Sequence, residues 1–495
     1  MYPSLSEMKQ IAQDPEIRRI PLCRALYADR FTPVEIMRTL RAASKHCYLL
    51  ESVESNQRWS RYSFLGYAPT LELTCTNGRL CIRRGAEGEQ AQEETTEVAH
   101  PGDAIRAILK DYRTARLDAM PPFTGGLVGY FSYDYMKYAE PTLRLNEAED
   151  DDFRDVDLML FDKVIVFDHD RQKLLLIAGV FTEDLERSYA QAEQTLDEME
   201  TPLNSGARAH FPQLRLESDL TPHFSKESYC RMIERAKQYI REGDIFQVVL
   251  SNPLTAQASG SLFDTYRVLR TTNPSPYMFY FSSDDIELAG ASPETLVKLE
   301  DGTLHTYPLA GTRPRGRTQA EDERLEAELR ADEKERAEHN MLVDLGRNDI
   351  GRISRLGSVR VEQYCNVVRY SHVMHLGSTV AGEIRPDRDM VDAVDAILPA
   401  GTLSGAPKLR ACEIIQELEN RKRGVYGGAI GYLDFTGNLD TCIAIRLAYK
   451  KNGRVCVQSG AGIVADSVPE NEFIECRNKA RAVVRALELA QEGLR

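Results

Sequence analysis

The stretch Tyr426-Gly-Gly-Ala-Ile-Gly-Tyr-Leu433 combines apolar residues with closely spaced glycines, and we interpret it as a strand. Long, charged segments that predict helices lie on either side of it, at Pro407–Arg423 and Pro469–Glu492, and a third lies at Gln319–Leu345. These helices fall between groups of strands and do not follow every strand. The order therefore favours an α+β fold, with large and mostly antiparallel sheets covered by helices, over a doubly wound α/β fold.

Shorter elements are predicted from local signals. Residues 71–76 and 79–83 are strand-like and flank Asn77-Gly78, which supplies the positive φ angles that a two-residue hairpin turn needs. Residues 85–97 are acidic and lack large apolar side chains, so we expect an exposed loop there. Ser225 is a typical N-cap for a helix that runs to about Gly243.

The length allows two or three domains, or one large interlocked unit. The chain has 495 residues, and a domain usually has about 100–200. Residues 201–222 are rich in Pro, Ser, Gly and polar residues, which is typical of a linker. We therefore predict an N-terminal domain at residues 1–215 and a second domain at residues 216–495.

Composition excludes several classes of protein. The 62 basic and 76 acidic residues leave a formal charge of −14, which argues against nucleic acid as a partner. No window of about 18 uncharged apolar residues predicts a membrane span, and the first residues lack the layout of a signal peptide. The 10 cysteines form no Cys-x-x-Cys pair, which is typical of reduced thiols in a cytoplasmic protein.

Two predicted helices carry the same pair of carboxylates. Glu335 and Glu338 are three residues apart, as are Glu472 and Glu475, so each pair lies on one helix face. A solvated surface explains a single pair, but four converging carboxylates would raise one another's pKa unless a cation neutralised them. Hard oxygen ligands without Cys or clustered His favour Mg²⁺. The sequence therefore predicts a magnesium site.

Glycine-rich segments and two cations indicate where an anion binds. Gly401–Lys408 places backbone N–H groups before a predicted helix, whose N-terminus attracts anions. Gly460-Ala461-Gly462 resembles a dinucleotide fingerprint, but the acidic residue about 20 positions on is missing, so we expect a tight turn with amides facing a carboxylate. Arg446, in an apolar strand, needs an anionic partner. Both it and Lys479 could meet a surface carboxylate or the substrate.

These motifs, together with others, resemble the chorismate-utilising enzymes, and in particular the large, synthase component of anthranilate synthase. The motifs, in chain order, are Ala291-Ser-Pro-Glu294, Pro308–Gly316, the helix with Glu335 and Glu338, Gly401–Lys408, Tyr426–Gly431, Ile445-Arg446, and Gly460–Gly462 followed by Glu472 and Glu475. The resemblance implies a chorismate-binding-enzyme type fold with an N-terminal regulatory domain. It also implies a lyase that makes anthranilate and pyruvate from chorismate and ammonia, via 2-amino-2-deoxyisochorismate, in the first step of tryptophan biosynthesis.

The resemblance further implies how chorismate, a dianion, is held. Glu338 and Glu475 would bind Mg²⁺, supported by Glu335 and Glu472 directly or through water. The ion and the segment Gly401-Thr402 would hold the ring carboxylate. The remaining substrate-binding positions that it implies, toward the enolpyruvyl group, are Tyr426, Arg446, Gly460, Ala461, Gly462 and Lys479.

Catalytic roles follow from the same resemblance. Glu294 would protonate the departing 4-hydroxyl, which a carboxyl group does near neutral pH only if burial raises its pKa. His375 would assist loss of pyruvate, although His372 lies three residues before it and either histidine could serve the elimination. Glu338 and Thr402 complete the expected catalytic set.

Two positions select the reaction within the family. Relatives that make isochorismate carry a water-activating lysine where this chain has Gln247, which cannot act as a base. Relatives that make 4-amino-4-deoxychorismate carry a nucleophilic lysine at the position of Ala310, in the turn with Gly311 and Thr312. Both differences point to ammonia adding at C2. The alternative is that Gln247 and Ala310 are only packing residues.

Two segments, one from each half of the chain, resemble the tryptophan-binding elements of the family. They are Leu50, Glu51 and Ser52 in the first half, and Pro274, Ser275, Pro276, Tyr277 and Met278 in the second. The resemblance implies feedback inhibition, because a ligand between two halves can bias how they pack. Without it, the segments are a strand end and a rigid turn.

The sequence shows no glutaminase motif of its own. Ammonia would therefore come from free ammonium or from a separate glutamine amidotransferase small subunit, in a hetero-oligomer that we expect to be a heterotetramer. Two other functions stay open: a synthase that stops at 2-amino-2-deoxyisochorismate, and a catalytically silent tryptophan-sensing subunit. The intact Glu294, Glu338, Glu475 and Arg446 disfavour the silent subunit.

Overall fold

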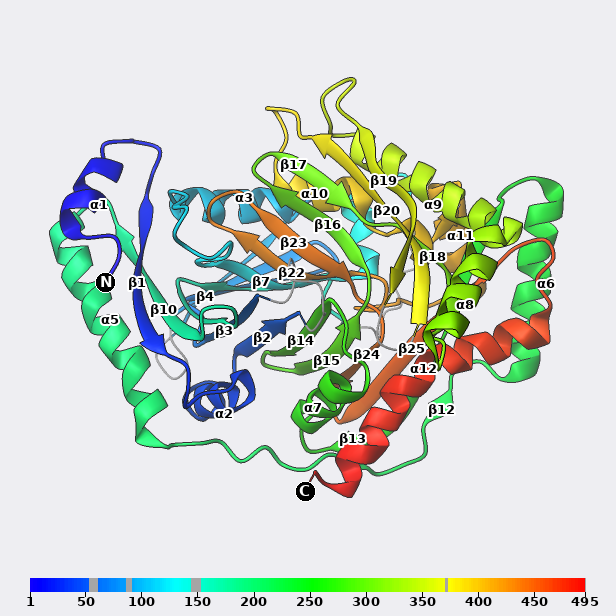
Figure 1. Cartoon of the computed structure of the whole chain (residues 1–495), viewed down its shortest axis with the longest axis horizontal. Coiled ribbons are helices and arrows are strands. Elements are labelled where there is room, and N and C mark those ends of the chain that lie inside the picture. Colours follow the sequence, from blue (N-terminus) through cyan, green and yellow to red (C-terminus); the bar gives the residue numbers. More distant parts are fainter. Residues whose placement is uncertain (53–60, 86–90, 144–152, 370–372, 495) are drawn as a thin grey trace.

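The computed structural model describes residues 1–52, 61–85, 91–143, 153–369 and 373–494. Within these residues the strands form two large sheets whose ladders are antiparallel (Figure 1). The first sheet has 13 strands, in spatial order β1 (Arg19–Tyr27), β10 (Lys173–Phe181), β9 (Lys163–Asp168), β3 (Tyr62–Tyr67), β2 (Cys47–Glu51), β14 (Tyr277–Ser282), β15 (Ile286–Ser292), β24 (Leu447–Lys451), β25 (Arg454–Ile463), β13 (Gln247–Ser259) and β11 (Arg215–Leu216), with β12 (Thr221–Pro222) and β21 (Gly405–Ala406) also paired to β13.

In the described ranges of the chain, the second sheet has 12 strands. In spatial order they are β18 (Leu309–Pro314), β20 (Val373–Glu383), β17 (Thr303–Thr306), β16 (Thr295–Glu300), β23 (Leu439–Ile443), β22 (Ala429–Asp434), β7 (Gly126–Phe131), β8 (Val156–Phe161), β4 (Leu71–Thr76), β5 (Arg79–Arg84) and β6 (Gln92–Glu97), with β19 (Arg360–Arg369) paired to β20. The α+β fold with large antiparallel sheets is thereby confirmed.

Helices cover the outer faces of both sheets, because each sheet must bury its second face as well. Helices α2, α5, α7 and α12 pack on the first sheet, and α9 and α10 pack on the second (Figure 1). The α-helices are α1 (Leu5–Ile11), α2 (Pro33–Ala43), α3 (Gly102–Asp111), α4 (Met136–Ala139), α5 (Leu185–Ser205), α6 (Lys226–Glu242), α7 (Phe263–Thr272), α8 (Gln319–Ala331), α9 (Glu333–Gly351), α10 (Met390–Ile397), α11 (Lys408–Glu419) and α12 (Pro469–Glu492), and short 3₁₀ turns lie at Tyr133–Tyr135 and Gly401–Leu403.

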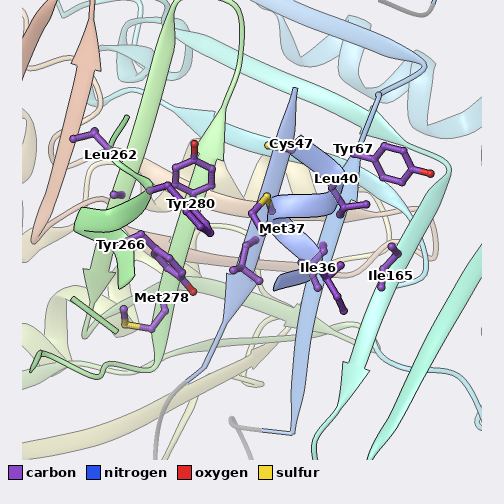
Figure 2. Close-up of a cluster of buried hydrophobic side chains, with 14 of the residues drawn as sticks. Ile36, Met37, Leu40, Cys47, Tyr67, Ile165, Leu262, Tyr266, Met278 and Tyr280 are labelled. Atoms are coloured by element: carbon purple, nitrogen blue, oxygen red, sulfur yellow. The ribbon is translucent and has the colours of Figure 1, made fainter. Parts of the chain in front are cut away.

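The core lies on both sides of each sheet, because successive side chains of a strand point to opposite faces. In β2, Cys47 and Leu49 belong to the core that α2 covers, whereas Tyr48 belongs to the core between the sheets. Figure 2 shows part of the helix-side core, in which α2 contributes Met37 and β14 contributes Tyr280. The strands therefore hold the two sheets and the helices in fixed layers.

Both sheets run through both halves of the chain. β2 of the first half pairs with β14 of the second, and β7 of the first half pairs with β22 of the second. The expected division at residue 215 falls at the start of the short strand β11. It does not separate two sheets, so the two predicted domains form one interlocked unit in the structure.

Local predictions are confirmed where a cap or a turn determines them. The hairpin β4–β5 turns at Asn77 and Gly78, with φ angles of 49° and 80°. Helix α6 begins after Ser225, whose hydroxyl accepts a hydrogen bond from the N–H of Ser228 at 3.2 Å, and ends at Gly243 with φ 85°. The predicted helix at 469–492 is α12.

Three element predictions are wrong. Residues 92–97 are not a loop but the edge strand β6, which is hydrogen-bonded to β5. All six of its residues are exposed, so the strand needs no apolar side chains. Residues 86–90 lie outside the described ones. The helix predicted at 319–345 is two helices, since Asp332 ends α8 and caps α9 by accepting from the N–H groups of Lys334 and Glu335. The helix predicted at 407–423 ends at Glu419 because Asn420 turns left-handed, with φ 45°.

In the part of the chain that the structure describes, every helix is too short or too polar to cross a lipid bilayer.

The contact between β7 and β22 gives a test of how the two halves are joined. A Cβ at Gly428, the residue before β22, would lie 2.1 Å from the carbonyl oxygen of Phe131. We expect Gly428→Ala to lower the free energy of unfolding by about 1–3 kcal/mol, because the methyl group forces the strands apart. Urea unfolding followed by circular dichroism measures this.

Gly351→Ala is the matched control, because a Cβ there meets only Val359 Cγ2, at 4.0 Å. This variant should unfold at the urea concentration of the wild type or above it. Equal midpoints for the two variants would show that β7 and β22 do not need the close approach.

Candidate active site

Glu294 lies where the chain passes from β15 of the first sheet to β16 of the second. The hydroxyl of Thr402, in the 3₁₀ turn Gly401–Leu403, donates a hydrogen bond to Glu294 Oε1 at 3.1 Å. Burial raises the pKa of Glu294 to about 7, against the lowering effects of this hydrogen bond and of the positive charges of Arg446 and Lys479. The carboxyl group can therefore hold a proton near neutral pH.

His375 lies on β20, beside the turn that carries the predicted specificity residues. Its Nδ1 is 2.8 Å from the carbonyl oxygen of Gly311 and 3.1 Å from the hydroxyl of Thr312. Because a carbonyl only accepts, Nδ1 carries the proton in the neutral ring and Nε2 is the basic nitrogen. Burial lowers the pKa of His375, which favours this neutral form. His372 lies outside the described residues.

The turn of β18 connects His375 to the first acidic pair. Gly311 has a φ of 63°, and a Cβ there would be 3.1 Å from Glu335 Oε2 on α9. Ala310 is buried beside it. The structure thus places the turn with Gly311 and Thr312 beside His375 and Glu335.

The two acidic pairs influence each other across α9 and α12. Desolvation and then the charge of Glu335 raise the pKa of Glu338, and Glu475 of α12 adds to this. Desolvation also raises the pKa of Glu472, and the charge of Glu475 contributes. Lys479 opposes both shifts. Between the two helices, the charge of Glu475 therefore acts on Glu338, and the convergence of all four carboxylates stays a prediction.

Cations already pair with two of these acids. Lys479 lies 2.9 Å from Glu475, and Arg313, which the sequence analysis did not select, lies 3.2 Å from Glu335. Among the described residues, three possible metal ligands come within 4.8 Å of one another only at His46, Glu72 and Asp284, where Arg83 bridges the two carboxylates. The magnesium site at the four glutamates stays a prediction.

The segment Gly460-Ala461-Gly462 is not a tight turn, as expected from its glycines, but part of strand β25, paired with β13. Its glycines serve close approach across the sheet. A Cβ at Gly460 would lie 3.0 Å from the hydroxyl of Tyr426, and one at Gly462 would lie 2.6 Å from Gln247 Nε2. The predicted substrate-binding residues Tyr426 and Gln247 therefore both lie beside the glycines at the end of β25.

Arg446 does not lie in an apolar strand, as the sequence suggested. It occupies an exposed bend between β23 and β24, with φ 50°. Its carbonyl accepts from the N–H of Ala291, three residues before Glu294, and its charge lowers the pKa of both Glu294 and His375. The guanidinium group thus faces the site without being buried.

A buried ion pair beneath the site was missed by the sequence analysis. The side chains of Arg423 and Glu419 are each only 1% exposed, and Arg423 Nε donates to Glu419 Oε2 at 3.0 Å. The other two nitrogens of Arg423 donate to the carbonyls of Leu403 and Val249, both at 2.7 Å. The pair therefore ties the turn that holds Thr402 to strand β13. In the sequence, this ion pair could have been found only from the spacing of Glu419 and Arg423, which are four residues apart.

A separate cavity of about 590 Å³ is lined from both sheets. The predicted tryptophan-binding residues that line it are Leu50, Glu51, Ser52, Pro276, Tyr277 and Met278, and it also meets Lys298, Tyr432 and Asp440, which the sequence analysis did not select. Pro274 and Ser275 do not line it. The carboxylate of Glu51 is paired with Arg270 at 2.9 Å. The two predicted segments thus meet at one cavity.

Two large antiparallel sheets covered by helices, with a buried carboxyl group where the chain crosses between them, are the features to compare with the chorismate-binding class. The sequence model described as chorismate binding enzyme matches residues 45–485. The menaquinone-specific isochorismate synthase MenF from Escherichia coli shares the fold, with a TM-score of 0.69 at 20% identity over 98% of each chain.

Relatives with higher sequence identity indicate the group within this class to which the chain belongs. Anthranilate synthase component 1 from Acetivibrio thermocellus is 46% identical over 99% of each chain, and that from Aquifex aeolicus is 42% identical over 99% of this chain and 98% of the relative. Anthranilate synthase component I from Streptococcus pneumoniae has a TM-score of 0.74 at 39% identity, over 88% of this chain and 94% of that chain. The chain is an enzyme that belongs to the chorismate-binding family, within its anthranilate synthase component 1 group.

The buried pair of Arg423 and Glu419 predicts a large loss of stability when it is broken. Arg423→Met leaves Glu419 buried and uncompensated, so we expect the free energy of unfolding to fall by about 3–5 kcal/mol. The exposed pair of Arg324 and Glu328, also four residues apart, supplies the control Arg324→Met, which should have far less effect. Urea unfolding of both variants compares them, and similar losses would contradict the assigned role of Arg423.

Proposed function

We propose that the chain converts chorismate and ammonia into anthranilate and pyruvate, via 2-amino-2-deoxyisochorismate, as the first step of tryptophan biosynthesis. The observation that carries the proposal is the carboxyl group of Glu294, with its pKa raised to about 7 and its hydrogen bond from Thr402. The similarity to relatives named anthranilate synthase component 1 supports it.

The first chemical step needs an acid at the 4-hydroxyl of chorismate. Hydroxide is a poor leaving group, so the proton of Glu294 passes to this oxygen and water departs while ammonia adds at C2. Thr402 keeps the carboxyl group in place through its hydrogen bond. Gln247 cannot activate water and Ala310 has no nucleophile, so neither competes with ammonia.

The two carboxylates of chorismate need separate partners. Arg446 and Lys479 are the cations whose charges reach Glu294, and Tyr426 with the amides of Gly460, Ala461 and Gly462 completes the surface for the enolpyruvyl carboxylate. The oxygen-only donor set of Glu338 and Glu475, supported by Glu335 and Glu472, fits Mg²⁺. When bound, Mg²⁺ supplies a positive charge for the ring carboxylate, beside Gly401 and Thr402.

The second step removes pyruvate and makes the ring aromatic. The basic Nε2 of His375 accepts the proton from C2 as the enolpyruvyl C–O bond at C3 breaks. Nδ1 stays oriented by the carbonyl of Gly311. Burial keeps the ring neutral, and so able to accept a proton, because it lowers the pKa.

Feedback inhibition by tryptophan is the function that we propose for the cavity of about 590 Å³. Its volume suits an aromatic amino acid. Ammonia would come from a glutamine amidotransferase small subunit, since the name component 1 in the relatives implies a second component, and we propose a heterotetramer. The ten free cysteines suit a cytoplasmic enzyme.

Anthranilate formation tests the proposed reaction. The purified chain with chorismate, ammonium and Mg²⁺ should produce anthranilate fluorescence and pyruvate, and EDTA should abolish both until Mg²⁺ is restored. Glu338→Gln should lower kcat more than about 100-fold, because a loss of several kcal/mol of charge stabilisation has this size. Glu333→Gln, on an exposed acid of the same helix, is the control.

Other products would identify the alternatives. Accumulation of 2-amino-2-deoxyisochorismate without pyruvate would mean a synthase that stops at the intermediate. Binding of tryptophan without any turnover of chorismate would mean a silent sensing subunit.

The pH dependence of kcat tests Glu294. An acid must be protonated to donate, so kcat at saturating ammonia should fall as pH rises through about 7, the pKa of Glu294. Thr402→Val removes the hydrogen bond that lowers this pKa, so the fall should move to higher pH. Glu294→Gln should lose about 10²–10⁴-fold in kcat and show no such fall. An unchanged profile in Glu294→Gln would assign the acid to another residue.

A further inference from the structure

The wall of the cavity and the backbone of the general acid are adjacent in the sequence and in space. Cys442 lines the cavity, and the N–H of the next residue, Ile443, donates to the carbonyl of Glu294 at 2.9 Å. On the other strand, Thr295 follows Glu294 directly and pairs with Cys442 across β16 and β23. A displacement of Cys442 in the cavity wall would therefore move the N–H of Ile443, which is hydrogen-bonded to the carbonyl of Glu294.

Tyr277 connects the cavity to this backbone through its hydroxyl group. The ring of Tyr277 lines the cavity, and its oxygen lies 2.9 Å from the hydroxyl of Thr295 and 2.8 Å from Asp440 Oδ1. A phenol has one proton, which goes to the carboxylate, so the hydroxyl of Thr295 must donate to Tyr277. The chain of donors runs from Thr295 through Tyr277 to Asp440.

Both ends of this chain are anchored in buried strands. Thr295 is 7% exposed, and Asp440 pairs with Lys298 in the register of β16 and β23. Tyr277 itself begins β14 and pairs with Ser292, whose hydroxyl donates to the carbonyl of Ile443 at 2.7 Å. Residues 292–295 are thus hydrogen-bonded to both β14 and β23. Because the packing around them is tight, a shift of Tyr277 should also move these residues.

We propose that Tyr277 is a positioning residue for the general acid, because its hydroxyl holds Thr295 and thereby places Glu294 against Thr402, and that a ligand in the cavity acts on catalysis by moving this hydroxyl. The first part concerns the reaction alone. The second part rests on the proposed feedback function and names the contact through which it works.

Thr295→Val tests the first part, because it removes the hydroxyl group, keeps the shape of the side chain and alters no residue that lines the cavity. We expect kcat to fall about 5–10-fold, the size of one hydrogen bond, with KM for chorismate within about threefold of the wild type. Tyr277→Phe should have the same effect on kcat. Tyr277→Phe also removes the hydrogen bond to Asp440, but both changes remove the one between Tyr277 and Thr295. The double variant should therefore lose no more than the larger single loss.

Thr441→Val is the matched control. The Thr441 hydroxyl donates to the carbonyl of Val297 at 3.0 Å, between the same two strands, without contacting residues 292–295 among the described hydrogen bonds. It should leave kcat within about twofold. If Thr295→Val matches this control, if its KM rises while kcat stays, or if the effects of Thr295→Val and Tyr277→Phe add, the positioning role is wrong.

Tryptophan titration tests the second part. Calorimetry on Thr295→Val should give the Kd of the wild type within about threefold. The fraction of its own uninhibited activity that remains at saturating tryptophan should be clearly larger than the fraction that remains in the wild type. Inhibition of Thr295→Val as complete as that of the wild type would overturn the coupling. If the wild type binds no tryptophan, the proposed feedback function and this coupling both fail, whereas the kcat comparison still decides the positioning role.

Discussion

The guanidinium group of Arg423 is the interaction on which the site depends. It is fully buried and must satisfy its donors inside the protein, because an unpaired buried charge is costly. It does so with Glu419 and with the carbonyls of Leu403 and Val249. These bonds lock the turn with Thr402 onto the strand that begins at Gln247. The acid Glu294 meets Thr402 only because this turn is held, so the chemistry is built on a buried charge with a fixed geometry.

Charge balance also governs the side of the site that carries the glutamates of α9 and α12. The charge of Glu475 on α12 raises the pKa of Glu338 on α9, and Lys479 and Arg313 pair with Glu475 and Glu335. A polypeptide that places acids together in this way must neutralise them, by cations of its own or by a bound metal ion. A dianionic substrate adds to the same need. The proposed Mg²⁺ would meet this need by sharing its charge between the protein and a carboxylate of the substrate.

The two sheets give the proposed regulation a physical basis. β2 and β14 come from opposite halves of the chain and are neighbours, and the cavity of about 590 Å³ lies against both of them. Glu294 stands where the chain crosses from one sheet to the other. A ligand between packed sheets cannot displace one strand without displacing the next. The connection between cavity and acid is thus a property of the layered fold.

Sequence by itself determined the features that depend on a few neighbouring residues. Asn77-Gly78 produces its turn and Ser225 starts its helix because caps and positive φ angles act locally. The motifs indicated the family because the residue types and their order along the chain can be read directly from the sequence. Tertiary structure alone decided the rest. Arg446 lies in an exposed bend, and Gly460 to Gly462 lie in a strand. Pairing partners far away in the chain determine these outcomes, and no local pattern contains them.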